Sequence, residues 1–198
     1  MWRFEKKFVL ERASYITFCK ELHIKGYFKA FPDRIVNSIY FDDTLLRSYY
    51  ENINGESNRT KYRLRFYGSQ FSGKGVWEQK RKSVDLNHKI TEEYKESYTI
   101  DKRLVFPNQE HLRPLIHVQY TREYFYSDRD QIRVTIDKEI RYINFNSKDV
   151  INENSLIVEY KCPQNILIKD VPSILSNLSR SSKYCKAISA HRLSAELY

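Results

Sequence analysis

The sequence predicts an α+β fold in which antiparallel strands close into a β-barrel, with flanking helices and helices at the C-terminal end. Three successive segments, at residues 60–67, 75–82 and 89–94, have the alternating pattern of strands and are separated by polar turns. Tyr and Phe account for 16 and 11 of the 198 residues, whereas Gly and Pro number 5 each. This composition favours strands with few loose linkers, and we expect residues 1–198 to form one domain.

In the first half of the chain, each further element has its own signal. Residues 2–9 alternate as a strand does, and residues 11–22 are predicted to form a helix because their apolar side chains lie roughly on one side. Residues 36–41 are expected to form the next strand. Asp42 then precedes a predicted helix at residues 45–52, so we expect Asp42 to be a helix cap and not a catalytic acid.

In the second half, residues 100–115 are expected to hold one or two short helices, because Pro107 and Pro114 mark boundaries there. Strand character then returns and is followed by two closing helices. We expect strands at residues 116–126, 131–138, 140–145 and 156–161, and helices at residues 170–178 and 184–197.

The formal net charge of +9 points to an anionic partner, such as nucleic acid, a membrane surface or a phosphate compound. Cys19, Cys162 and Cys185 lie far apart and form no CxxC pair, and the 5 His residues show no metal-ligand spacing. The first residues lack the apolar core of a signal sequence, and no run of about 18 apolar residues predicts a membrane span. A cytoplasmic location is therefore expected.

Basic residues alternate with apolar residues in several of the expected strands. Lys61, Arg63 and Arg65 occupy one strand face, opposite Tyr62 and Leu64. A charged strand face is most often simply exposed to solvent, but here several such faces fall in one sheet. Two cations about 6 Å apart cost roughly 3 kcal/mol at an effective dielectric of about 20, so the sheet needs a bound anion or interleaved carboxylates. Closing the sheet would place these groups around one polar interior, which we expect to be the functional site.

The same segments resemble the polyphosphate-polymerase domain of the vacuolar transporter chaperone (VTC) family, within the triphosphate tunnel metalloenzymes. The matching motifs lie in collinear order over nearly the whole chain. They are Arg3-x-Glu5-x-Lys7-Phe8, Ser38-Ile39-Tyr40-Phe41-Asp42, Lys61-x-Arg63-x-Arg65-x-Tyr67-Gly68, Glu78-x-Lys80, Tyr120-x-Arg122, Arg133-Val134-Thr135-Ile136-Asp137, Val158-Glu159-Tyr160-Lys161 and Ser181-Ser182-Lys183-Tyr184.

The resemblance implies a tunnel of antiparallel strands in which basic side chains bind ATP, or another triphosphate, and the growing polyphosphate. The residues implied to act in catalysis as phosphate ligands are Arg63, Arg65, Lys80, Arg122 and Arg133. The further phosphate-binding residues that it implies are Lys7, Lys61, Lys89, Tyr120, Lys161, Ser182 and Lys183. Glu159 is implied to hold a divalent metal, Mn or Mg, while Glu5 and Glu78 either add a second metal ligand or form ion pairs that hold the lysines in place.

The reaction that the resemblance implies transfers the γ-phosphoryl group of ATP to the terminal phosphate of polyphosphate. Because that acceptor is already ionised, no general base is needed, which agrees with the lack of a His or Ser–His nucleophile pair. Arg3 stands where hydrolytic tunnel enzymes have a Glu, which favours a polymerase. Asp137 is expected to form a structural ion pair.

Two alternatives share the fold: a tunnel triphosphatase, and a non-catalytic module that binds polyphosphate or nucleotide. A nucleic-acid partner is disfavoured, because single-strand binders place aromatic rings and basic groups on one face, whereas here most rings lie opposite the Arg row. A membrane-protein partner is left open.

Overall fold

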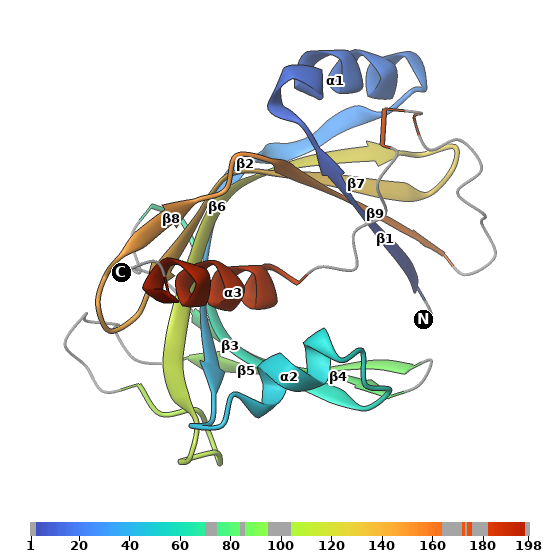
Figure 1. Cartoon of the computed structure of the whole chain (residues 1–198). Coiled ribbons are helices and arrows are strands. Elements are labelled where there is room, and N and C mark those ends of the chain that lie inside the picture. Colours follow the sequence, from blue (N-terminus) through green and yellow to red (C-terminus); the bar gives the residue numbers. More distant parts are fainter. Residues whose placement is uncertain are drawn as a thin grey trace. The chain divides into compact units, whose positions relative to one another are not determined.

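The computed structural model describes residues 3–69, 75–83, 86–94, 104–163, 172, 174–175 and 182–196 (Figure 1). The chain forms two compact units, each assembled from separate segments. Unit 1 comprises Met1–Arg34, Tyr120–Ile140 and Glu153–Arg180, and unit 2 comprises Ile35–Gln119, Arg141–Asn152 and Ser181–Tyr198. The expectation of a single domain stays a prediction.

Strands dominate both units, and the α+β class is confirmed. In chain order the described elements are β1 (Arg3–Leu10), the 3-10 helix η1 (Arg12–Ser14), α1 (Tyr15–Ile24), β2 (Phe28–Asp42), α2 (Arg47–Ile53), β3 (Arg59–Tyr67), β4 (Gly75–Ser83), β5 (Leu86–Tyr94), β6 (Arg113–Ser127), β7 (Ile132–Asn144), β8 (Val150–Asn152), β9 (Leu156–Pro163) and α3 (Lys183–Glu196). Among the residues that the structure describes, no helix has the length and the apolar composition that crossing a membrane requires.

The strands hydrogen-bond in the order β1-β9-β7-β6-β2-β3-β4-β5, with β8 beside β7. Within the described residues this order ends at β1 and β5, and no pairing joins these two strands. The predicted closure into a barrel is therefore not confirmed. Glu78, Asp137 and Glu159 are buried carboxylates paired with basic side chains, so the structure contains the interleaved carboxylates that the sequence analysis gave as one way to offset the repulsion.

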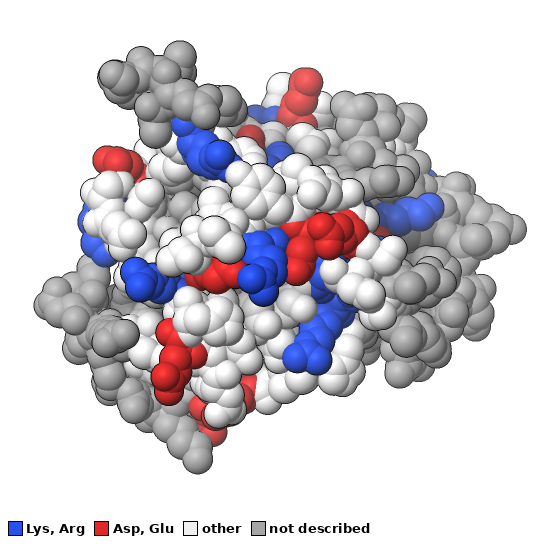
Figure 2. All heavy atoms as spheres, turned by 60° about the horizontal axis from the view of Figure 1, so that its bottom comes forward, with Lys and Arg blue, Asp and Glu red and all other residues white. Residues whose placement is uncertain are grey.

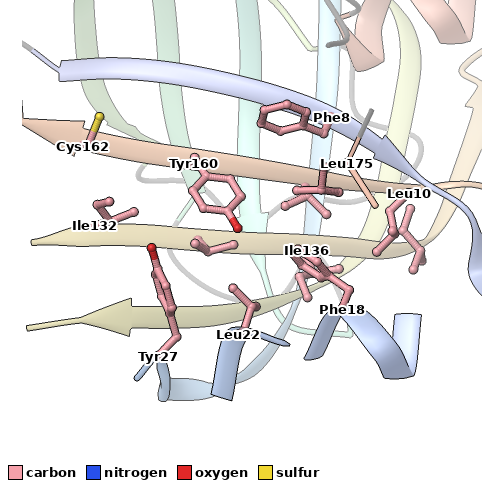
Figure 3. Close-up of a cluster of buried hydrophobic side chains, with 13 residues drawn as sticks. Phe8, Leu10, Phe18, Leu22, Tyr27, Ile132, Ile136, Tyr160, Cys162 and Leu175 are labelled. Carbon is pink, nitrogen blue, oxygen red and sulfur yellow. The ribbon is translucent and has the colours of Figure 1, made fainter. Parts of the chain in front are cut away.

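The core of unit 1 lies between α1 and the strands β1, β7 and β9 (Figure 3). Phe18 and Leu22 of α1 are fully buried there, in one cluster with Ile132 and Ile136 of β7 and Tyr160 of β9. Because side chains alternate along a strand, the residues between these apolar positions of β7 and β9 point to the opposite face of the sheet. That opposite face carries the polar residues of unit 1.

The core of unit 2 contains the apolar faces of β2, β3 and β4. Leu64 and Phe66 of β3 are buried in one cluster with Phe41 of β2 and Trp77 of β4. Phe41 packs edge-on against Trp77, with ring centroids 5.5 Å apart. The basic residues of β3 occupy the positions between the buried ones, as the alternation in the sequence predicts.

Asp42 joins the end of β2 to two helices. Its buried carboxylate accepts hydrogen bonds from the backbone N–H groups of Ser48 and Tyr49 in α2, at 3.0 and 2.9 Å. The hydroxyl of Tyr184 in α3 donates to the same carboxylate at 2.5 Å. The predicted role of Asp42 as a helix cap is confirmed, and the same side chain also holds the first turn of α3.

Residues 100–115 do not form the predicted helices where the structure describes them. Residues 104–112 contain turns and an isolated β-bridge, and β6 begins directly after them. Asn108 has a φ of 57°, and together with the ring of Pro107 it favours chain reversal over a helix. The helix predicted at residues 170–178 falls mostly outside the described residues.

β2 and β7 extend far beyond the strands predicted there. β2 begins at Phe28 and not at residue 36, because its first half is largely exposed and contains Pro32, which weakens the strand pattern. β7 runs without interruption through Glu139, although the sequence predicts two strands there. The φ of 54° at Glu139 marks a local irregularity that interrupts the alternation but not the strand.

Candidate functional site

The predicted site residues fall into two groups, one in each unit. Unit 2 holds Lys61, Arg63, Arg65, Glu78, Lys80, Lys89, Ser182 and Lys183, whereas unit 1 holds Glu5, Lys7, Tyr120, Arg122, Arg133, Glu159 and Lys161. Side chains alternate between the two faces of a strand. Within each unit, this alternation places the predicted site residues of neighbouring strands on the same face of the sheet.

In unit 2, the register of β2, β3 and β4 places polar residues in rows across the sheet. Arg63 of β3 lies opposite Tyr40 on β2 and Glu78 on β4. One step along β3, Arg65 lies opposite Ser38, and its Nε donates to the Ser38 hydroxyl at 3.1 Å. Arg65 is only 8% exposed, so the sheet holds a nearly buried positive charge on this face.

Glu78 is the carboxylate of this face. It is 3% exposed and forms ion pairs with Arg63 and with Lys89 of β5, the latter at 2.6 Å between Oε1 and Nζ. Burial alone would raise the pKa of Glu78, but the charges of Arg63, Arg65 and Lys89 lower the pKa to about 2. Glu78 is therefore ionised at neutral pH. The sequence leaves open whether Glu78 is a metal ligand or an ion-pair partner of the lysines. The structure contains the ion pairs.

Three lysines form a row beside this ion pair. Lys61 of β3 lies opposite Lys80 of β4, and Lys80 lies opposite Lys89 of β5. Directly opposed residues of antiparallel strands have Cβ atoms about 5 Å apart, and like charges at that separation are destabilising. Glu78 pairs with Lys89 of this row, and an extended anion with a charge on each of its units, such as a phosphate chain, has the form to contact all three lysines.

Tyr40 belongs to the site, although the sequence analysis does not single it out. Its ring stacks on Tyr184 of α3 with centroids 5.3 Å apart, and its hydroxyl accepts a hydrogen bond from Arg63 Nη1 at 3.2 Å. Burial alone would raise the pKa of Tyr40. The charges of Arg63 and Arg65, together with that hydrogen bond and the charge of Lys183, lower the pKa to about 8.

This shift predicts a pH dependence of anion binding. Above pH 8 the Tyr40 phenolate pairs with Arg63 and Arg65 and competes with an anionic ligand, so tripolyphosphate should bind about tenfold more weakly at pH 9 than at pH 7. Tyr40→Phe should abolish this loss, whereas the ligand's own ionisation acts equally on both proteins. Calorimetric titration at the two pH values measures the difference. Equal pH profiles of wild type and variant would exclude the competition.

The same group affects stability in the opposite direction. Because folding lowers the pKa of Tyr40 from 10.0 to about 8, its contribution to stability is complete above pH 10 and is lost as the pH falls through 8. Thermal melts between pH 7 and 10 should therefore show less alkaline destabilisation for wild type than for Tyr40→Phe.

The start of α3 lies beside this face of unit 2. Lys183 is partly exposed, and its charge acts on the hydroxyl of Tyr40. Burial raises the pKa of Cys185, and the charge of Lys61 and a hydrogen bond with Ser182 oppose that rise. Lys183 is thus close enough to act on Tyr40 of β2, and Ser182 interacts with Cys185, on which the charge of Lys61 of β3 also acts.

In unit 1, the register of β1, β9 and β7 forms comparable rows. Glu5 lies opposite Lys161, and Lys161 lies opposite Arg133, while Lys7 lies opposite Glu159. Lys7 Nζ also pairs with Glu5 at 3.0 Å, and Lys161 Nζ pairs with Glu159 at 3.0 Å. Basic and acidic groups therefore alternate on this face, and Arg133 is its exposed member.

Arg122 of β6 is held by carboxylates in the same unit. Its Nε and Nη2 donate to the two oxygens of Asp137 at 2.5 and 2.8 Å, and Asp137 is fully buried. The expected ion pair of Asp137 is confirmed. Arg122 Nη2 also lies 3.9 Å from Glu159, and the guanidinium lies 5.2 Å from the ring centroid of Tyr120. The structure thus brings Arg122, Tyr120 and Glu159 together.

Glu159 was implied to be a metal ligand, and its surroundings allow this to be tested. Its carboxylate is 6% exposed and faces Lys161 and Arg122. Among the described residues, no three His, Cys, Asp or Glu side chains converge into a ready-made metal cage. Mg²⁺ and Mn²⁺ prefer oxygen ligands, and Mg²⁺ is often held by one or two carboxylates together with substrate phosphates and water. A single carboxylate can serve as the protein ligand of such a metal where phosphate and water complete the coordination, and the carboxylate of Glu159 is at present paired with Lys161 and Arg122.

Ser38 and Tyr40 are uncharged and were therefore not predicted as site residues, although the alternation in the sequence indicates which face they occupy. In the segment 36–41 they alternate with Ile39 and Phe41, which are buried in the core. Their cross-strand partners are the two arginines of β3. Extending the alternation to uncharged polar residues would have placed both on the site.

Basic and acidic side chains are also interleaved on the surface. On the face drawn in Figure 2, Lys and Arg lie directly beside Asp and Glu. A nucleic-acid-binding surface is expected to show an unbroken basic patch or stripe. Among the described residues on this face, basic and acidic groups are mixed and do not form such a patch.

The family comparison decides the membership of this chain. The model of the VTC domain matches residues 2–192. The chain belongs to the VTC domain family. The resemblance seen in the sequence motifs is confirmed, and no curated protein matches the sequence.

Solved structures resemble this VTC domain over nearly its whole length. A protein from Pyrococcus horikoshii OT3 is 13% identical, with a TM-score of 0.56, and the match covers 96% of this chain and 99% of that one. A "putative adenylate cyclase" from Vibrio parahaemolyticus is 10% identical with a TM-score of 0.51, covering 97% and 87%. Another from Bacillus halodurans is 9% identical with a TM-score of 0.53, covering 98% and 91%. At such identities the likeness shows a shared fold.

Proposed function

We propose that this VTC domain is a polyphosphate polymerase. It binds ATP and polyphosphate on its basic sheet faces and transfers the γ-phosphoryl group of ATP to the end of the chain in a metal-dependent reaction. The observation that carries the proposal is the face of unit 2, where the row of Lys61, Lys80 and Lys89 lies beside Arg63 and Arg65. Membership of the VTC family supports an enzyme that acts on triphosphates. A cytoplasmic location stays a prediction from the sequence.

Phosphoryl transfer requires that the donor and acceptor phosphates are aligned and that charge on the transferring group is neutralised. Arg63 and Arg65 suit neutralisation, because a guanidinium stays protonated and grips phosphate oxygens through two N–H groups. The lysine row suits alignment, because each ammonium is a point charge that can hold one phosphate unit. The attacking oxygen belongs to an ionised phosphate, so no side chain has to remove a proton from it.

The carboxylates have two different roles in this proposal. Glu159 would hold the divalent metal, which when bound neutralises charge on phosphate oxygens. Glu78 keeps Arg63 and Lys89 in position before the ligand arrives, since it pairs with both. Glu5 acts in the same way on Lys7. The pairing offsets the repulsion between neighbouring cations in the ligand-free protein.

The proposal predicts that ATP and Mn²⁺ yield an acid-labile phosphate polymer, and that Arg65→Ala abolishes its formation. Arg65 is expected to matter this much because its charge is nearly buried on the phosphate-binding face. Arg81→Ala is the matched control, since Arg81 is exposed on the opposite face of β4. Polymer is measured on gels with a polyphosphate stain, and free phosphate is measured in the same reaction.

Binding is measured separately from turnover. Millimolar tripolyphosphate should raise the melting temperature, because a ligand that binds only the folded state stabilises it by mass action. Release of free phosphate without polymer would show that the domain is a triphosphatase and not a polymerase. A melting shift without any turnover would instead indicate a binding module, and the absence of a shift would refute the phosphate site itself.

A further inference from the structure

Four aromatic side chains and one arginine form a surface feature of unit 1 that the proposed phosphoryl transfer does not use. Phe31 of β2 packs edge-on against Tyr124 of β6 with ring centroids 5.9 Å apart, and Phe28 packs in the same way against Tyr126 at 6.0 Å. The guanidinium of Arg34 lies 5.9 Å from the ring centroids of both Phe31 and Tyr124. We call these five residues the aromatic strip.

The aromatic strip is exposed at its β2 side. Phe31 is 56% exposed and Phe28 is 46% exposed, and Arg34 is exposed as well. Phe and Tyr side chains bury a large apolar area when they are covered, so leaving two of them in water forgoes that gain. Two exposed rings in adjacent edge-on pairs, with a cation over one pair, indicate a surface suited to a flat aromatic ligand.

The two tyrosines of the strip lie on the same sheet face as Arg122. Tyr124 and Tyr126 follow Arg122 at two-residue steps along β6, so these three side chains point the same way. The intervening residues confirm this, because Glu123 accepts a hydrogen bond from α1 and Phe125 packs against the core beneath α1. A strand advances about 3.3 Å per residue, so the Cα atoms of Arg122 and Tyr124 are only about 7 Å apart.

The chemistry of the strip favours a nucleobase over a phosphate chain. The faces of aromatic rings are electronegative and do not attract phosphate oxygens. Nucleobases, in contrast, stack on aromatic rings and on the planar guanidinium of arginine, and they do so with little preference for one base. Arg122, beside the strip, belongs to the residues to which phosphate binding is assigned. A nucleotide consists of a flat base joined to a phosphate chain. Its base matches the aromatic strip, and its phosphates match Arg122.

We propose that the aromatic strip binds the base of the nucleoside triphosphate whose phosphates lie on the basic face of unit 1. The inference rests on the proposed function, because it assigns the substrate's base to a place beside the unit 1 residues to which that proposal gives a role in phosphate binding. It adds that the domain distinguishes a nucleoside triphosphate from bare triphosphate, and that Phe31 and Tyr124 supply this distinction.

The test compares two ligands on the same set of full-length proteins. Calorimetric titration with a non-hydrolysable ATP analogue and with tripolyphosphate is carried out on wild type, Phe31→Ala, Phe31→Tyr and Ile24→Ala. Phe31→Ala should weaken binding of the ATP analogue about tenfold, the order expected for one stacked base, and leave tripolyphosphate binding unchanged. Phe31→Tyr should retain the affinity for both ligands. Ile24, which is 83% exposed on α1, is the control for loss of an exposed apolar side chain.

The other outcomes separate this inference from the function on which it rests. If Phe31→Ala leaves the affinity for the ATP analogue unchanged, or weakens both ligands equally, the strip does not bind a base and the phosphate site stands. If wild type binds neither ligand, the phosphate site and the inference both fail. Sedimentation of the same proteins completes the test, because a wild-type dimer that Phe31→Ala converts to monomer would make the strip an interface between copies of the chain.

Discussion

Glu78→Gln is expected to lower the free energy of unfolding of the ligand-free protein and to enlarge the stabilisation that tripolyphosphate provides. The carboxylate is 3% exposed and pairs with Arg63 and Lys89, so its removal takes a negative charge away from these two cations and from the nearby Arg65. Loss of one partner from a buried ion pair costs about 3 kcal/mol. A bound triphosphate supplies the missing negative charge, so the ligand-induced rise in melting temperature should be larger in the variant than in wild type.

The pH dependence adds a second measurement of the same effect. Because folding lowers the pKa of Glu78 from 4.5 to about 2, its contribution to stability is complete above pH 4.5 and is lost as the pH falls towards 2. The difference in stability between wild type and Glu78→Gln should therefore be constant near neutral pH and shrink in acid. Glu92→Gln is the matched control, since Glu92 is exposed on the opposite face of the neighbouring strand.

A smaller ligand-induced shift in Glu78→Gln would overturn this account. It would mean that Glu78 aims Arg63 at the phosphate and does not compete with the phosphate for Arg63. The comparison thus separates two functions of one buried carboxylate, and it does so without any assay of turnover.

The alternation of side chains is what made the site predictable. Lys61, Arg63 and Arg65 face away from the core because Leu64 and Phe66 must be buried, and this choice is made within one strand. Local patterns of this kind also placed Asp42 at the start of a helix. Both predictions depend only on residues close together in the sequence.

Cross-strand partners were not predictable in the same way, because register links distant segments. One row contains Lys61, Lys80 and Lys89 only because β3 pairs with β4 and β4 pairs with β5 in the observed registers. A slip of one residue would move every side chain of a strand to the other face. The sequence left Glu78 either as a metal ligand or as an ion-pair partner, since only the register places it between Arg63 and Lys89.

The boundaries that were predicted wrongly have physical reasons. Around residues 104–112, Pro107 and Pro114 suggest the boundaries of short helices, but Asn108 adopts a positive φ in a turn. At Glu139 a positive φ shifts the alternation of side chains between the two faces. The sequence pattern of this one strand therefore resembles that of two strands. In both places one residue outside the usual backbone regions changes the local pattern, and propensity alone does not reveal it.

Arg122→Ala is expected to destabilise the protein by about 3 to 5 kcal/mol, because it removes the guanidinium that pairs with the fully buried carboxylate of Asp137. The double variant Arg122→Met with Asp137→Leu should recover most of that loss, since apolar residues can replace a buried ion pair. Urea unfolding of the wild type, Arg122→Met, Asp137→Leu and the double variant measures the coupling between the two side chains. A coupling close to zero would show that the pair does not stabilise unit 1.

The double variant also tests the role of Arg122 toward phosphate in a folded protein. If Arg122 binds phosphate as proposed, the variant should bind tripolyphosphate about tenfold or more weakly, since a hydrogen bond to a charged group contributes about 1.5 to 3 kcal/mol. Titration of the double variant beside the Arg81→Ala control measures this loss. Unchanged affinity would make Arg122 a structural residue whose hydrogen bonds serve Asp137, and the phosphate ligands of unit 1 would then be sought among Lys7, Lys161 and Arg133.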